Sequence, residues 1–177
     1  MKRDIWGKNP PQGTTPSIAL INPKYDRNVG AVLRAASCFD VKQVWFTGNR
    51  VRFEEGKRLP REERMKGYED VELFQYDYVF DVHQTATPIA IEVREGAEML
   101  TTFEHPTNAL YVFGPEDGGL QRNTLQHCHR IVTIPTRHCT NLAAAVYITL
   151  YDRMLKSGQF YKLEEERGFT EEALIMG

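Results

Sequence analysis

The 177-residue chain has few cysteines, no long apolar run and no excess of charge of one sign. Its three cysteines, Cys38, Cys128 and Cys139, are an odd number without a framework spacing, which excludes a secreted disulfide scaffold and predicts reduced thiols. No segment approaches the roughly 20 apolar residues of a membrane-spanning helix. The first residues, MKRDIWGKNPPQG, carry charge but lack the apolar segment of a signal peptide. We therefore expect a soluble, cytoplasmic protein with no membrane partner.

The charge balance excludes a protein that is held to nucleic acid by bulk charge, because 22 basic residues face 24 acidic ones. The charges are nevertheless unevenly distributed. Basic residues dominate the segments 1–34, 42–66 and 121–141, whereas acids dominate 69–104. If the three basic segments converge, they form one positive face suited to a polyanion. The alternative is a scattered, solvated surface.

Short apolar runs alternate with helical stretches, which is typical of an α/β domain. The runs predict strands at 17–21, 41–48, 88–93, 109–113 and 130–135. The stretches between them predict helices at 29–39, 95–103, 121–128 and 142–156, with Gly158 ending the last. The charged stretch 49–67 is expected to be a surface excursion. We predict a mostly parallel sheet with helices on both faces, whose ligands bind at the carboxyl ends of the strands.

The last predicted helix is apolar on nearly every side through 142–151, whereas a surface helix shows a polar face. Either a deep core or a second subunit must cover its other side. Because a small domain rarely buries a whole helix, we favour a homodimer. The length suits a single domain, which we place at 1–157, followed by a C-terminal tail at 158–177.

Three loops between strands and helices hold the residues that suggest chemistry. In the first, Asn28 is placed to cap a helix, Gly30 leaves the first turn bare and Arg34 follows one turn later. A bare helix start with an arginine nearby attracts anions such as phosphate. The alternative is an ordinary capped helix with a surface arginine.

The second loop, YVFGPEDGGL at 111–120, runs from a buried strand into glycines that permit close approach to the backbone. Its acids, Glu116 and Asp117, are alternatively turn formers. The loop lacks the GxGxxG and GxxxxGKS/T patterns, so nothing supports a dinucleotide site or a P-loop.

The third loop, IPTRHCTNLAAA at 134–145, ends with Thr140 or Asn141 as a helix cap and places Cys139 beside a histidine and an arginine. Covalent catalysis by Cys139 is one interpretation, because cationic neighbours at a helix start activate a thiol. No nucleophile signature surrounds it, however. The nearby histidines and cysteines match no familiar zinc spacing, and we expect no metal.

Taken in this order, the segments NVGAVLRAA, YVFGPEDGGL and IPTRHCTNLAAAVYITLYDR resemble the three signature motifs of the SpoU (TrmH-like) family of SPOUT RNA methyltransferases. The resemblance spans about residues 17–155. The matching residues are Asn28, Gly30, Arg34, Phe113, Gly114, Glu116, Gly119, Leu120, Ile134, Pro135 and Asn141. The third loop departs from the family pattern, because it is shorter, lacks a glycine and has Cys139 and Thr140 where Ser-Leu is usual.

The resemblance implies a C-terminal trefoil knot, a homodimer with the active site at its interface, S-adenosylmethionine as cofactor, and methylation of a ribose 2'-hydroxyl in tRNA or rRNA. The implied catalytic residues are Asn28, Arg34, Glu116, Cys139 and Asn141. The implied cofactor-binding residues are Glu92, Gly114, Ile134 and Thr140. Two alternatives stay open: a non-catalytic RNA-binding homologue, which the altered third loop favours, and a methyltransferase acting on a base or a small molecule.

Overall fold

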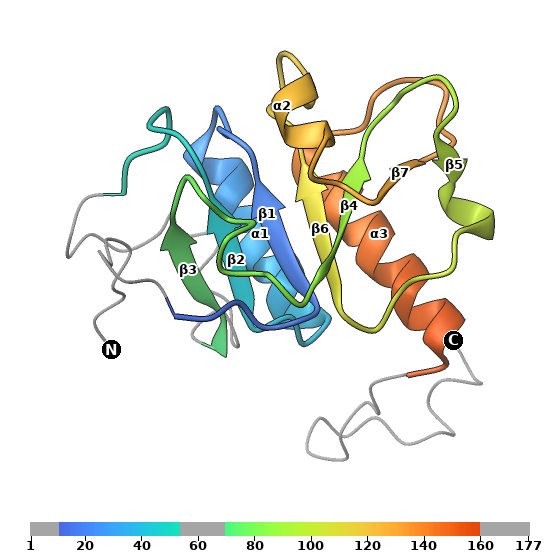
Figure 1. Cartoon of the computed structure of the whole chain (residues 1–177), viewed down its shortest axis with the longest axis horizontal. Coiled ribbons are helices and arrows are strands. Elements are labelled where there is room, and N and C mark those ends of the chain that lie inside the picture. Colours follow the sequence, from blue (N-terminus) through green and yellow to red (C-terminus); the bar gives the residue numbers. More distant parts are fainter. Residues whose placement is uncertain (1–10, 54–69, 160–177) are drawn as a thin grey trace, which may run out of the picture.

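A computed structural model describes residues 11–53 and 70–159, and its core is a seven-stranded sheet in which every strand pairing is parallel (Figure 1). The strands are β1 (Ser17–Leu20), β2 (Gln43–Phe46), β3 (Glu72–Gln75), β4 (Thr87–Ile91), β5 (Glu98–Met99), β6 (Ala109–Phe113) and β7 (Arg130–Thr133). Their order in the sheet is β3-β2-β1-β6-β4-β7-β5. The predicted parallel sheet is confirmed.

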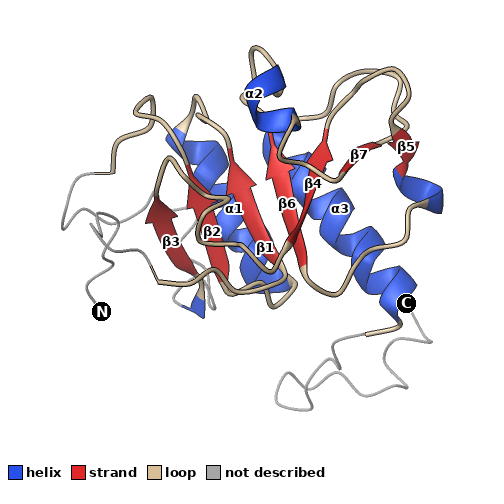
Figure 2. Cartoon of the chain, viewed as in Figure 1, coloured by secondary structure: helices blue, strands red, loops and turns tan. Residues whose placement is uncertain are grey.

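The central strands are apolar without alternation because both faces of the sheet are covered. Every residue of β1 and β6 is buried. Helices α1 (Asp26–Cys38) and α3 (Leu142–Ser157) lie together on one face (Figure 2), where they share a core cluster with the sheet. The segment 76–86 and the short helix α2 (Arg122–Leu125) pack on the other face. Helices therefore lie on both faces, although α2 covers little of the second one.

Some elements differ from the prediction. The helix predicted at 95–103 is wrong, because the chain there forms β5 and a short 3-10 turn at Leu100–Thr102. Gly96 has a φ of +77°, which interrupts a right-handed helix, and Glu98 pairs with Val132 of β7. The helix predicted at 121–128 exists but is limited to α2.

Strand β3 was not predicted. It lies at the edge of the sheet, and among its four residues Leu73 alone is fully buried, so its apolar signal is weak. Most of the predicted surface excursion at 49–67 lies outside the described residues, as do residues 160–177 of the predicted tail. The trefoil knot and the division at residue 157 stay predictions.

Helix α3 begins and ends as the sequence predicts. The Asn141 side chain caps it by accepting from the backbone N–H of Ala143 at 2.9 Å and of Ala144 at 3.3 Å, and Gly158 ends it with a φ of +66°. Leu150 is buried, but Tyr151 and Leu155 are 55% and 52% exposed. An apolar strip of α3 therefore faces away from the core. None of the helices in the described part of the chain is long and apolar enough to cross a membrane.

Candidate active site

A cavity of about 270 Å³ opens at the carboxyl ends of β4, β6 and β7, where open parallel sheets bind their ligands. The loops that follow these strands form its walls, together with Leu142 and Ala145 of α3. Six predicted site residues line it: Glu92, Gly114, Glu116, Ile134, Cys139 and Thr140. The structure therefore brings these six together from three separate loops.

Asn28 connects all three motifs through hydrogen bonds. Its Nδ2 donates to Oε1 of Glu116 at 2.5 Å, and Oε2 of Glu116 accepts from the backbone N–H of Lys24 at 2.8 Å. Asn28 Oδ1 in turn accepts from Nδ2 of Asn141 at 3.3 Å. Asn28 is only 6% exposed, so its amide needs these partners. A single hydrogen-bonded network thus fixes the first two loops and the start of α3 relative to one another.

The prediction that Asn28 caps α1 is wrong. The helix begins at Asp26, with Tyr25 as its N-cap residue, and Asn28 lies within the first turn. The Asn28 backbone N–H donates to the Tyr25 carbonyl at 3.1 Å, and its side chain is turned towards Glu116. The motif asparagine therefore joins the first turn of α1 to the second loop rather than capping its own helix.

Glu92 holds the far end of the second loop. Its Oε2 accepts from the backbone N–H of Leu120 at 2.6 Å, and its Oε1 accepts from the N–H of Val93 at 3.0 Å. A Cβ at Gly114 would lie 2.8 Å from the carbonyl carbon of Gly119 and 2.9 Å from Leu120 N. Gly114 is therefore required by the loop's own closure, before any ligand is considered.

The shortened third loop keeps its shape through Thr136. The Thr136 backbone N–H donates to the Ile134 carbonyl at 2.8 Å, and its hydroxyl donates to the His138 carbonyl at 2.8 Å. Cys139 follows directly and is exposed in the cavity wall. Across residues 11–53 and 70–159, no group of three histidine, cysteine or acidic side chains is arranged to hold a metal ion.

Arg34 does not line the cavity. It lies on α1, with an exposed side chain that makes no hydrogen bond or ion pair to any described residue. Its charge acts on Tyr147 of α3, where burial raises the pKa of the phenol and Arg34 opposes that shift. The Arg34 guanidinium is therefore accessible to a ligand on the α1–α3 side of the molecule.

Two of the three basic segments meet at the rim of the second loop. Arg50 donates to both carboxylate oxygens of Asp117, at 2.9 and 2.7 Å, and Lys24 Nζ lies 3.3 Å from the same group. The hydrogen bonds from Arg50, assisted by Lys24, hold the pKa of the Asp117 carboxyl well below its usual range. In the third segment, Arg130 is neutralised by Glu98. Two of the three basic segments therefore meet, but they do so around an acidic side chain.

Sequence reasoning missed this ion-paired group, because Asp117 precedes a glycine and matches a common turn pair. A usable signal was present. Lys24 and Arg50 follow two adjacent parallel strands, β1 and β2, whose carboxyl ends meet at one edge of the sheet.

The family model described as the SpoU rRNA Methylase family matches residues 16–151 of this chain. The chain belongs to this family. A curated relative, the tRNA (cytidine-2'-O-)-methyltransferase TrmJ of Methanocaldococcus jannaschii, is 28% identical over 153 residues, which cover 77% of this chain and 66% of TrmJ. The family membership inferred from the three motifs is therefore confirmed.

Two solved structures of SpoU proteins share the fold. The SpoU methyltransferase AviRb from Streptomyces viridochromogenes, in complex with AdoMet, matches with a TM-score of 0.71 at 16% identity, covering 86% of this chain and 61% of AviRb. The A. aeolicus TrmH/SpoU tRNA modifying enzyme matches with a TM-score of 0.68 at 13% identity, covering 89% of this chain and 87% of that enzyme. This SpoU chain spans just under two thirds of the length of TrmJ and of AviRb.

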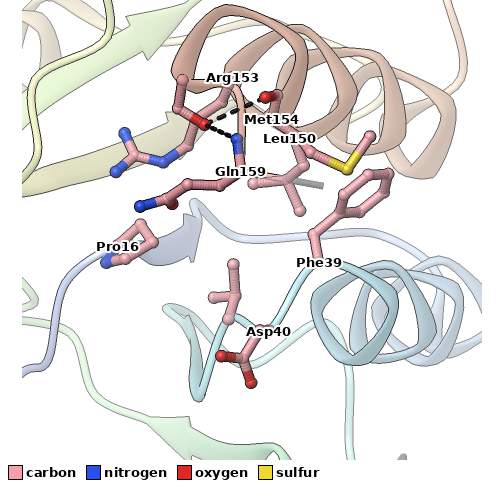
Figure 3. Close-up of a pocket in the computed structure, with 9 residues that line it drawn as sticks. Pro16, Phe39, Asp40, Leu150, Arg153, Met154 and Gln159 are labelled. Atoms are coloured by element: carbon pink, nitrogen blue, oxygen red, sulfur yellow. Dashed lines mark hydrogen bonds between the residues drawn. The ribbon is translucent and has the colours of Figure 1, made fainter. Parts of the chain in front are cut away.

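A smaller cavity, of about 120 Å³, lies near the amino end of β1 (Figure 3). It is lined by Pro16, by Phe39 and Asp40 after α1, and by Leu150, Arg153 and Met154 of α3. None of the nine predicted site residues lines it. The candidate active site is therefore the larger cavity.

Proposed function

We propose that the chain is an S-adenosylmethionine-dependent methyltransferase that modifies a ribose 2'-hydroxyl of RNA in the cytoplasm, with tRNA as the favoured substrate. The observation that carries the proposal is the hydrogen-bonded network of Asn28, Glu116 and Asn141 beside the larger cavity. Family membership supports it, as does the relative named for cytidine-2'-O-methylation of tRNA.

The cavity suits a cofactor with one flat apolar part and several polar groups. Ile91, Phe113 and Leu142 supply an apolar wall, and Thr140 and the backbone of the second loop supply polar groups. Its volume of about 270 Å³ is close to the lower end of the roughly 300–1,000 Å³ typical of small-molecule sites. We assign cofactor contacts to Gly114, Ile134 and Thr140. Glu92 also lines the cavity and supports the cofactor site by holding the second loop in place.

When bound, S-adenosylmethionine supplies a methyl group on a sulfonium, so the protein has to place the 2'-oxygen in line with it and assist loss of the hydroxyl proton. Arginine stays protonated at neutral pH. Arg34 therefore clamps a substrate phosphate and polarises the hydroxyl, while the phosphate assists proton removal. Asn28 and Glu116 hold the loops in register, and Cys139 and Asn141 complete the pocket wall.

We place the complete active site between two copies of the chain. Arg34 lies outside its own cavity, and the exposed apolar strip of α3 formed by Tyr151 and Leu155 lies on the same side of the sheet as α1. Burying this strip against a second copy removes apolar surface from water. The same contact gives Arg34 a route to the cavity of the partner subunit.

Mass-spectrometric nucleoside analysis of RNA from cells with and without the gene tests the proposal. We expect one 2'-O-methylated nucleoside of tRNA to disappear with the gene and to return with the wild-type copy. In single-turnover assays, Arg34→Lys loses about 10² or more in rate because the two-pronged geometry is lost. Cys139→Ser stays within about tenfold, whereas a nucleophilic cysteine would lose far more.

Two other results of the nucleoside analysis would each support a different function. Loss of a base-methylated nucleoside would replace the ribose by a base as the substrate. Unchanged nucleosides, together with no S-adenosylmethionine binding by the wild type, would identify a non-catalytic RNA-binding homologue.

A further inference from the structure

Tyr25 presents a partly exposed aromatic ring close to two cations. The residue is 38% exposed, with Lys24 Nζ 5.3 Å and the Arg27 guanidinium carbon 4.6 Å from the centre of the ring. Both distances are within the range of cation–π attraction. The ring belongs to neither core cluster. Packing of the fold therefore does not account for an aromatic side chain at this position.

The backbone at Tyr25 is tied to the candidate active site. The Lys24 N–H donates to Glu116 at 2.8 Å, and the Tyr25 carbonyl accepts from the N–H groups of Asn28 at 3.1 Å and Val29 at 3.4 Å. The Tyr25 side chain itself makes no capping hydrogen bond to α1. The ring is thus held in place by its backbone, next to the network, while the side chain is not needed to start the helix.

We infer that Tyr25 stacks on a nucleobase of the RNA substrate, next to the nucleotide that is methylated. This inference rests on the proposed function. Aromatic rings that stack bases beside positive groups that contact phosphates are the usual means of holding single-stranded RNA. Lys24 and Arg27 supply the positive groups here, and Arg50 lies at the same rim, where it and Lys24 share the one carboxylate of Asp117. A flat ring among cations suits a chain of bases and phosphates better than an acidic peptide, which has no base to stack.

The stacked base restrains the neighbouring ribose. A substrate anchored at Tyr25 loses the freedom to rotate its target nucleotide away from Arg34 and the cavity, which favours both binding and reaction. Tyr25 is therefore a positioning residue and takes no part in the methyl transfer itself.

The test compares Tyr25→Leu with Tyr25→Phe, using total tRNA from cells that lack the gene and a short single-stranded RNA that carries 2-aminopurine. We expect Tyr25→Leu to weaken tRNA binding by about tenfold or more and to abolish the quenching of 2-aminopurine fluorescence. Tyr25→Phe keeps the ring and retains both. S-adenosylmethionine affinity, measured by calorimetry, stays the same in both variants.

Tyr78 supplies the matched control, since it is a 66% exposed tyrosine in the segment 76–86, which belongs to none of the three motif loops. Tyr78→Leu should bind tRNA as the wild type does. Wild-type tRNA affinity in Tyr25→Leu, or an equal loss in Tyr25→Phe, would overturn the stacking role and leave the proposed function standing. A wild type that binds the cofactor but no RNA would overturn the proposed function, and the stacking role with it.

Discussion

Asn28 Nδ2 donates to Oε1 of Glu116 at 2.5 Å, across 88 positions of sequence. The bond joins the first turn of α1, which follows β1, to the loop after β6, and β1 and β6 are neighbours in the sheet. Since Glu116 also accepts from the Lys24 N–H, both of its oxygens face donors. Both carboxylate oxygens of Glu116 therefore act as acceptors in this geometry.

Glu116→Gln should therefore destabilise the site. The new amide nitrogen places a donor against a donor, which costs roughly 1–3 kcal/mol of unfolding free energy when a partly buried group loses its partner. Methyl transfer should fall with it. Urea denaturation and a single-turnover assay measure the two effects.

Asp117→Asn is the control for this variant, because Asp117 is the neighbouring acid and its ion pairs are exposed. Exposed pairs contribute at most about 1 kcal/mol, so the control should lose less stability. Equal losses of unfolding free energy in the two variants would show that the Asn28–Glu116 bond stabilises the protein no more than an exposed ion pair does.

Gly114→Ala should displace the second loop, because the new Cβ would meet the backbone of Gly119 and Leu120 at under 3 Å. We expect about tenfold or greater loss of S-adenosylmethionine affinity and a lower unfolding midpoint, as backbone must shift. Gly118→Ala is the matched control in the same loop, since a Cβ there meets nothing within 4 Å. Calorimetry that finds the two variants equal would show that the loop is not built around Gly114.

Buried histidines predict a loss of stability in acid. His105 Nδ1 lies 2.6 Å from the hydroxyl oxygen of Tyr111, and its Nε2 lies 2.8 Å from Oδ2 of Asp152. Burial lowers the pKa of His105 despite the attraction of Asp152, and burial also lowers the pKa of His83. Below roughly pH 6.5 the unfolded chain takes up these protons first. Stability is therefore complete above that pH and is lost progressively as the pH falls towards the lower folded values.

Urea denaturation at a series of pH values measures this effect. His105→Gln removes one of the two buried histidines, so its stability should depend less on pH than that of the wild type, whatever its absolute value. His129→Gln is the control, because His129 is exposed. A pH dependence that is identical in wild type and His105→Gln would exclude His105 as a source.

The apolar strip of α3 predicts self-association. Tyr151→Glu should convert a dimer at micromolar concentration into a monomer, because a charge placed in an apolar interface lacks a partner. It should also abolish methyl transfer if Arg34 acts on the partner's cavity. Ala145, although on the same helix, is a poor choice for this test because it is buried within its own subunit.

Light scattering gives the mass of the assembly, with Tyr78→Glu as a control on an unrelated exposed tyrosine. A wild-type monomer, or a Tyr151→Glu dimer, would contradict this arrangement.

The sequence predicted those features that depend on local pattern. The buried strands β1 and β6 are apolar runs, and Asn141 stands directly before an alanine-rich segment. Both strands and the cap of α3 could therefore be predicted from the sequence. Elements decided by distant contacts were not. Strand β5 exists because Glu98 and Met99 pair with β7, and nothing in the two residues themselves indicates this.

The same distinction holds for the candidate site. The motifs identified Asn28 and Glu116 separately, but spacing could not show that they are bonded to each other, and it suggested a helix cap for Asn28 instead. Likewise, Asp117 matched a turn, and its pairing with Arg50 depends on how three loops meet in space.

The most direct test supplies the purified wild-type protein with S-adenosylmethionine carrying a deuterated methyl group and with tRNA from cells that lack the gene. Mass spectrometry of the digested nucleosides then locates the label. The proposed function predicts a deuterated methyl group on the ribose of one nucleoside, absent when Arg34→Lys replaces the wild type at the same reaction time. Label on a base, or no label from protein that binds the cofactor normally, would contradict it.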